Sequence, residues 1–144
     1  GARQPERVSK GLGQGVLVSL LMTAALCVCQ FLGMELIIRA FKLDAAAAAI
    51  CRQHLFASVL FEPIFAIYFP ANGMFQGVGE GFHATFYALM ALGLRVVFAY
   101  SLYRTAFFGY TAIWWSQAMA WTLTLITCYA HFFRGKWKEK SLVS

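Results

Sequence analysis

Long apolar runs separated by short polar connections make up most of the chain. Four such runs cover residues 15–41, 45–75, 86–103 and 110–133. Each comes close to, or exceeds, the roughly 20 residues that a helix needs to cross the hydrocarbon core of a bilayer. The runs do not alternate apolar and polar residues as the strands of a membrane barrel do. In lipid every backbone group must be satisfied within its own segment, so the pattern predicts an all-α membrane bundle of four transmembrane helices.

The connections are too short to divide the chain into domains. The segment "KLDA" joins the first two runs, and "RTAFFG" joins the last two. Asp44 is predicted to cap the second helix by accepting a hydrogen bond from a free N–H. The expected organisation is one unit, with a basic arm at 1–14 and a tail at 134–144.

Composition supports a membrane protein over a soluble domain. The chain is 60% hydrophobic and 12% charged, whereas soluble domains are about half apolar and about a quarter charged. The net charge of +6 is divided between the two ends of the predicted bundle. Without interleaved aromatics to form a base-stacking groove, these charges predict no nucleic-acid partner.

The distribution of basic residues predicts the orientation. Four spans place both termini on one side, and lysine and arginine are held back on the cytoplasmic side. The terminal side carries Arg3, Arg7, Lys10, Arg134, Lys136, Lys138 and Lys140, against Arg39, Lys42, Arg52 and Arg104 at or near the other side. Both termini are therefore expected to be cytoplasmic.

Cysteines and histidines give no indication of an enzyme or a metal site. The cysteines, Cys27, Cys29, Cys51 and Cys128, all lie in apolar runs, where they are predicted to act as small hydrophobic residues. His54 and His131 lie near the ends of spans, and His83 is expected to be solvated in a turn. A membrane enzyme would need clustered His, Asp or Glu at the end of a span.

Glu62 is the main candidate for an ion or substrate site. An ionisable residue at membrane depth costs roughly 2.5–3.5 kcal/mol on insertion scales, so it needs a compensating role. The neighbouring Pro63 is predicted to bend the helix, and Pro70 lies seven residues on, on the same face. We expect a bent helix that lines a cavity; the alternative is a kinked helix packed against its neighbours. A carboxyl removed from water tends to keep its proton, which suits a group that exchanges protons.

Other polar and aromatic residues within the spans have simpler interpretations. Arg95 could snorkel, hold carbonyls or pair with an acid, and pairing is favoured. Arg95 and Tyr68 are also candidates, with Glu62, for an ion or substrate site. Glu35 and Arg39 are four apart, which predicts a local ion pair. Tyr68 and Trp121 lie deep in their spans, where they suit lipid-facing packing or a cavity for flat, lipophilic cations.

The stretch "GMFQGVGEGFHATF" (73–86) is rich in glycine and joins two predicted helices. Gly73 and Gly77 are four apart, which is predicted to let another helix approach closely. Gly77, Gly79 and Gly81 then permit a tight turn with positive φ. A nucleotide loop would need G-x-G-x-x-G after a strand, or Gly-Lys-Ser/Thr, and neither is present.

This stretch resembles the segment that closes the fourth helix of each lobe in the multidrug and toxic compound extrusion (MATE) transporters. The family pattern is roughly G-x-L-R-G-x-G-D-T-[KR]-x-P. Gly73, Gly77 and Gly79 match it, and Glu80 stands where Asp is usual. Gln76, Gly81, Phe82 and Ala84 replace the Arg, Thr, Lys/Arg and Pro. The segments "GARQPERVSKGLGQG", "LRVVFAY", "GYTAIWWSQAMAW" and "RGKW" resemble further family motifs in the same order.

The resemblance implies that these are the last four helices of a twelve-helix transporter built from two six-helix lobes. The expected partners are membrane lipid, the missing N-terminal eight helices and small organic cations. The implied activity is antiport coupled to protons or sodium, with no cofactor, in a bacterial inner membrane. Counting back from Gly77 places the family's coupling acid at Phe65, one turn from Glu62. The absent initiator methionine at Gly1 also suggests a piece of a longer protein.

Two alternatives stay open at this point. The chain could be a four-helix structural or assembly subunit without transport activity, or part of a related lipid-linked glycan flippase. The DNA upstream of Gly1 would separate the first alternative from a transporter, because eight further spans there would favour the transporter.

Overall fold

Four long helices account for nearly all of the described chain. The computed structural model describes residues 5–105 and 109–135. The helices are α1 (Pro5–Ala40), α2 (Ala45–Gly77), α3 (Gly81–Tyr103) and α4 (Ala112–Arg134), with a short 3₁₀ turn, η1 (Gly109–Thr111), before α4. No strand occurs in the described residues. The predicted all-α fold is confirmed. The basic residues Arg3, Lys136, Lys138 and Lys140, and residues 106–108 of the last connection, lie outside the described part.

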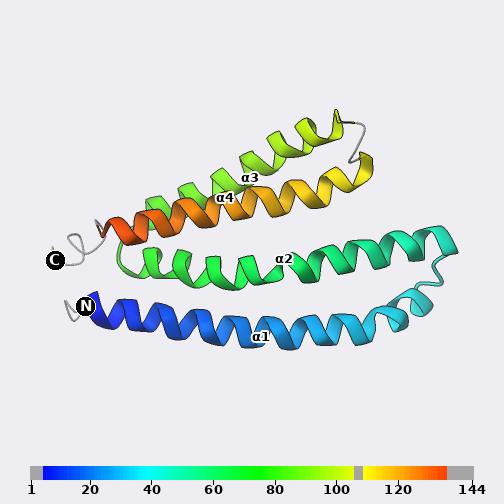
Figure 1. Ribbon diagram of the computed structural model, residues 1–144. Coiled ribbons are helices and arrows are strands. Elements are labelled where there is room, and N and C mark those ends of the chain that lie inside the picture. The colour runs from blue at the N-terminus through cyan, green and yellow to red at the C-terminus, as the bar shows by residue number, and fades with distance from the viewer. Residues whose placement is uncertain (1–4, 106–108, 136–144) are drawn as a thin grey trace.

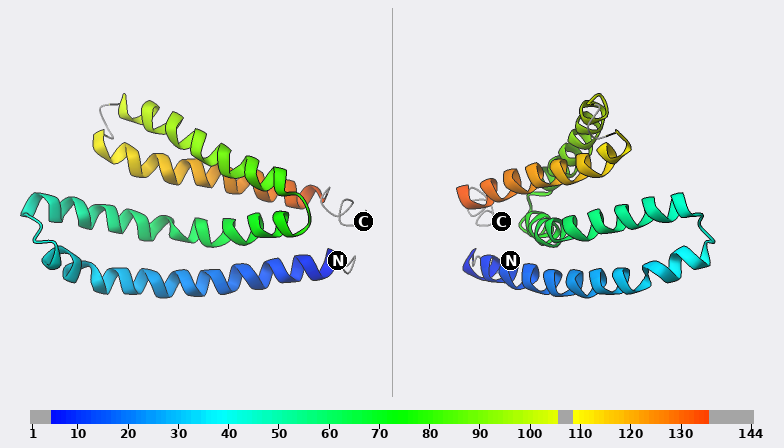
Figure 2. Two further views of the ribbon diagram at one scale, coloured as in Figure 1. Left: turned by 180° about the vertical axis from the view of Figure 1, so that it is seen from behind. Right: turned by 45° about the vertical axis from the view of Figure 1, so that its right-hand side comes forward.

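The helices pair as α1 with α2 and α3 with α4, and contacts between α2 and α4 join the two pairs. Neighbouring helices run in opposite directions, so α1 begins and α4 ends at the same end of the bundle (Figure 1). We call this the terminal end. Toward the other end the α3–α4 pair diverges from the α1–α2 pair, as the two views of Figure 2 also show.

Each helix boundary has a local cause. α1 begins at Pro5, so the helix starts ten residues earlier than predicted and residues 5–14 of the predicted arm are helical. Proline is favoured in a first helical turn, and Glu6 there interacts well with the positive end of the helix dipole. The capping prediction for Asp44 is confirmed, because Ala47 N donates to Asp44 Oδ1 at 2.7 Å. Gly135 ends α4 in the left-handed conformation, with φ of 73°.

The buried core lies at the terminal end of the bundle. It contains Leu12 of α1, residues of α2 and α3, and Cys128 of α4; the α2 and α3 members are Tyr68, Ala71, Phe75, Ala84 and Tyr87. Small residues in this set let the helices come close, while Tyr68 and Phe75 fill the space between them. The bundle is therefore tied together most closely where the pairs converge.

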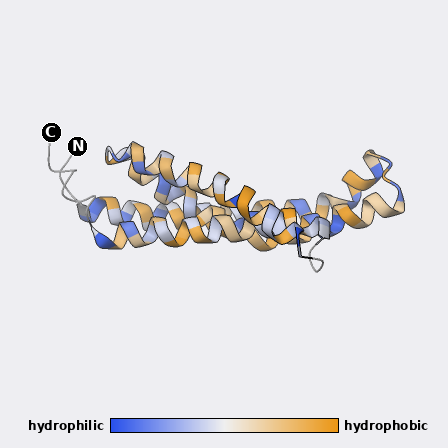
Figure 3. Ribbon diagram, turned by 90° about the horizontal axis from the view of Figure 1, so that it is seen from above, coloured by the Kyte–Doolittle hydropathy of each residue, from blue (hydrophilic) through white to orange (hydrophobic). Residues whose placement is uncertain are grey.

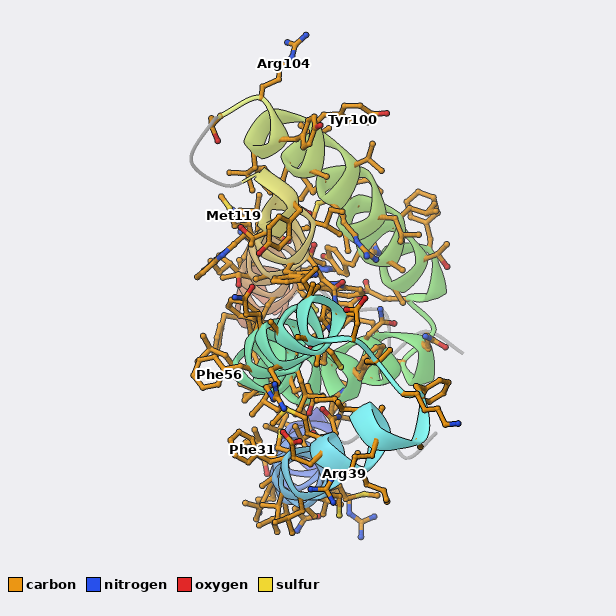
Figure 4. The ribbon with its side chains drawn as sticks, turned by 90° about the vertical axis from the view of Figure 1, so that its right-hand side faces the viewer. Phe31, Arg39, Phe56, Tyr100, Arg104 and Met119 are labelled. Atoms are coloured by element: carbon orange, nitrogen blue, oxygen red, sulfur yellow. The ribbon has the colours of Figure 1, made fainter. Side chains whose placement is uncertain are left out.

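Much of the outer surface is apolar. Figure 3 shows hydrophobic positions along the length of the helices. Phe31, Phe56 and Met119 point away from one side of the bundle in Figure 4, and they are 55%, 66% and 43% exposed. A water-soluble protein rarely exposes so continuous an apolar surface. This surface suits contact with lipid tails or with further apolar helices.

Three of the four helices, α1, α2 and α3, are long and apolar enough to cross a membrane by length and composition. α4 has the same length as α3, 23 residues. Its tryptophan, threonine, serine and glutamine side chains lower its hydropathy, and several of its small residues are buried against the other helices. Four membrane spans were predicted, and length and composition support a membrane span for three of the four observed helices.

Candidate functional site

Glu62 lies on α2 and receives two hydrogen bonds from α1. Gln30 Nε2 donates to Glu62 Oε1 at 2.6 Å, and Cys27 Sγ donates to Glu62 Oε2 at 2.9 Å. The side chain is partly buried, as expected for a carboxyl between two packed helices. Both carboxyl oxygens therefore have a neutral donor, and no cationic side chain of the described chain pairs with Glu62.

A cavity of about 280 Å³ opens beside Glu62 between α2 and α4. It lies where the two helix pairs diverge, and its walls carry one acid, several aromatic rings and a few small polar groups. Its lining residues are His54, Ala57, Ser58, Phe61, Glu62, Phe65, Trp114 and Gln117. A carboxylate beside aromatic rings attracts a cation through charge and through the electron-rich ring faces. The predicted cavity beside Glu62 is thus present.

Ring contacts hold the aromatic wall in place. His54 meets Trp114 edge-on with ring centroids 5.3 Å apart, and Phe61 meets Trp115 in the same way at 5.4 Å. Phe65 contacts Trp121 at 5.0 Å. These edge-to-face pairs link α2 to α4, so the shape of the cavity depends on how the two helices are placed.

The two prolines of the candidate site both lie inside α2. Pro63 lacks an N–H, so the carbonyl of Val59 loses its usual helical partner one turn from Glu62. The two halves of α2 run in different directions in the right-hand view of Figure 2. Pro70 serves another purpose, because its Cβ lies 3.5 Å from the Cβ position that a side chain at Gly15 would take. The close approach of α1 to α2 therefore occurs at Gly15.

Tyr68 is separated from the cavity of Glu62. It is 1% exposed within the core and contacts Trp121 with ring centroids 5.0 Å apart. Asn72 Nδ2 donates to the Tyr68 hydroxyl and, at 3.2 Å, to the carbonyl of Ala84 on α3. Tyr68 thus belongs to a buried polar link between α2 and α3, and it does not line the cavity.

Arg95 is exposed on α3, away from Glu62. No hydrogen bond or ion pair joins it to another residue within 5–105 or 109–135, so the favoured pairing with an acid is not found there. The structure does not bring Glu62, Tyr68 and Arg95 together into one site.

The glycine-rich turn differs in part from its prediction. α2 continues to Gly77, and of the three turn glycines only Gly79 has positive φ, at 85°. A Cβ at Gly73 or Gly77 would meet nothing within 4 Å, so the predicted close helix approach at these two residues is wrong within the described chain. The last member of the motif, Glu80, is 3% exposed and lies beneath the turn.

The predicted ion pair between Glu35 and Arg39 is also wrong. Glu35 Oε1 instead accepts from Arg52 Nε at 2.9 Å and from Arg52 Nη2 at 2.8 Å. Arg52 lies on α2, so the pair crosses between helices where a partner on the same helix had been expected. Spacing along α1 could not reveal a competitor from another helix.

His83, which was expected to be solvated, is partly covered, and His131 is nearly buried. The side chain of His131 is 14% exposed and that of His83 is 36% exposed, and both lie beside Glu80. Cys27 and Gln30 were also missed as partners of Glu62. Their spacing of three residues puts them on one face of α1, a signal that was available in the sequence. What the sequence lacked was the register of α1 against α2.

Comparison with models of protein families assigns the chain to a family. The MatE family model matches residues 1–101, which include α1, α2 and most of α3. The chain belongs to the MatE family. MatE proteins are membrane transporters, and this is the family that the glycine-rich turn resembles, so the chain is a membrane-embedded protein of a transporter family. The match includes Glu62, Phe65 and the turn motif; the segments "GYTAIWWSQAMAW" and "RGKW" lie beyond it. Searches of curated proteins and of solved structures gave no match.

Proposed function

We propose that this MatE chain contributes a cation-binding site to a secondary antiporter that exports organic, often cationic compounds. The observation that carries the proposal is the position of Glu62 in an aromatic cavity, with neutral donors on both carboxyl oxygens. A carboxylate held in this way can bind a proton, a sodium ion or a cationic substrate.

The family resemblance points to the same cavity, although to a different residue. Counting back from Gly77 places the family's coupling acid at Phe65, which lines the same cavity as Glu62. An acid one turn earlier on the helix thus opens into the same space. The coupling ion would be a proton or sodium, and no further cofactor is required.

Alternating access in secondary transporters moves one bundle of helices against another around a fixed site. The cavity lies between α2 and α4, which belong to the two helix pairs that diverge from the core. Changes in that divergence would open or close the cavity. We further propose that lipid and eight additional helices of a complete transporter cover the apolar outer faces. The protein would lie in a bacterial inner membrane, with both ends of the chain on the cytoplasmic side.

The substitution Glu62→Gln tests the proposal, because it keeps the size of the side chain and removes its charge. In everted vesicles that carry the full-length transporter, we expect normal protein levels and loss of ethidium efflux driven by the ion gradient. Glu35→Gln is the matched control, since Glu35 is an acid of the same chain outside the cavity. Efflux by Glu62→Gln that keeps the wild-type dependence on the gradient would contradict the proposal.

A further inference from the structure

Glu80, in the turn between α2 and α3, is close to two histidines from different helices. Its Oε2 lies 3.5 Å from His131 Nε2 on α4 and 3.9 Å from His83 Nδ1 on α3. The Glu80 side chain is 2% exposed, and the two histidine rings have centroids 4.6 Å apart. One nearly buried carboxyl therefore faces two groups that can each take up a proton near neutral pH.

The ring of His131 is held so that it can accept a proton without turning. Its Nδ1 is 2.7 Å from the Tyr87 hydroxyl, and the ring stacks on Phe75 with centroids 4.9 Å apart and planes 11° apart. In the neutral ring, the Tyr87 hydroxyl donates to Nδ1 and Nε2–H faces Glu80. In the protonated ring, Nδ1–H donates to the Tyr87 oxygen and Nε2–H still faces Glu80.

The charges around this proton are of both signs. On α4, Arg134 lines the same cavity as both histidines, where its positive charge opposes their protonation, and Cys128 is buried nearby. α3 contributes Tyr87 and α2 contributes Tyr68, while on α1 the charged residues of the first turns, Glu6, Arg7 and Lys10, are exposed. Glu80 is thus the acid of this cluster. A carboxylate with so little solvent contact is costly without a nearby positive charge.

Water can reach the cluster. A cavity of about 390 Å³ is lined by His83, Tyr87, Thr127, Ala130, His131 and Arg134. Protons can therefore exchange between the histidines and the solution at the terminal end of the bundle. This cavity is separate from the one beside Glu62, with which it shares no lining residue.

We propose that Glu80, His83 and His131 form a second proton-binding site, which holds the α2–α3 turn against the end of α4 when a histidine is protonated. The turn and the end of α4 are joined more tightly in acid and more loosely as the pH rises through the range in which the histidines lose their protons. The site would make the terminal end of this MatE chain respond to pH independently of the cavity beside Glu62.

Histidine-selective ¹⁵N NMR of the protein in detergent tests the site. This chain has three histidines, so its signals can be assigned by single His→Gln variants. Removing the charge with Glu80→Gln is expected to weaken proton binding at His131 about tenfold, since an opposite charge at this range stabilises the protonated form. The signals of His83 and His54 in the same spectra serve as internal references. A His131 titration midpoint unchanged by Glu80→Gln would overturn the proposal.

Hydrogen exchange gives a second readout that does not depend on Glu80→Gln folding well. After correction for intrinsic rates, exchange at residues 78–82 of the wild type should be several-fold slower at about pH 5.5 than at about pH 8, on either side of the ordinary histidine range. In His131→Gln this pH difference should disappear. If it persists, protonation of His131 does not hold the turn.

Discussion

Gln30 Nε2 lies 2.6 Å from Glu62 Oε1, and this contact joins the middle of α1 to the middle of α2. Together with the thiol of Cys27, it gives the only acid deep in α2 two partners that carry no charge. A neutral partner orients a carboxyl without neutralising it. In the proposed function, a cation would bind at Glu62 without first breaking an ion pair.

Removing the donor at position 30 should change ion binding while leaving the fold intact. We expect Gln30→Met to shift the ion concentration that gives half-maximal efflux about tenfold, because a hydrogen bond to a charged group contributes about 1.5–3 kcal/mol. Gln14 is an exposed glutamine of the same helix, and Gln14→Met is the matched control. Ion dependence equal to that of the wild type in Gln30→Met would show that the contact plays no part in binding.

Substitutions at two glycines of the turn motif distinguish the effect of backbone conformation from the effect of helix packing. Gly79→Ala is expected to lower the free energy of unfolding by about 1–2 kcal/mol, because Gly79 has φ of 85° and a side chain there is strained. Gly73→Ala should be neutral or stabilising by up to about 1 kcal/mol, since Gly73 is helical and its Cβ would meet nothing within 4 Å. Thermal unfolding in detergent measures both. Greater damage from Gly73→Ala than from Gly79→Ala would mean that another helix covers Gly73.

The ion pair between Glu35 and Arg52 should be weak but specific. Its side chains are 50% and 46% exposed, so solvent screens the attraction, and we expect a coupling energy of about 0.2–1 kcal/mol. A double-mutant cycle with Glu35→Gln and Arg52→Gln measures it. The same cycle with Arg39→Gln in place of Arg52→Gln should give no coupling. Coupling to Arg39 and not to Arg52 would reverse the assignment.

The proposed orientation predicts which cysteine variants an impermeant thiol reagent can reach. In a background without native cysteines, Thr105→Cys at the end opposite the termini should label from outside intact cells. Phe82→Cys, at a position 80% exposed beside the α2–α3 turn, should label only after permeabilisation. The reverse pattern would place the termini outside and contradict the positive-inside argument.

Several features of this protein follow from the sequence by itself. The lengths of the apolar runs determine the number of helices, because a helix rises by a constant distance per residue and a bilayer has a limited thickness. The capping role of Asp44 depends only on neighbouring residues and was predicted. A positive φ was predicted for Gly77, Gly79 and Gly81, and only Gly79 has it. The motif around Gly77 pointed to the family that the match over residues 1–101 then showed.

The tertiary structure decided which side chains meet. Glu35 had a partner four residues away in Arg39, but the register of α1 against α2 brought Arg52 closer. The same register placed Cys27 and Gln30 at Glu62, and the packing of α4 beneath the α2–α3 turn brought His131 to Glu80. Periodicity shows which face of a helix a residue occupies. It does not show how far one helix slides along another, and a shift of one turn, about 5.4 Å, is enough to exchange every one of these partners.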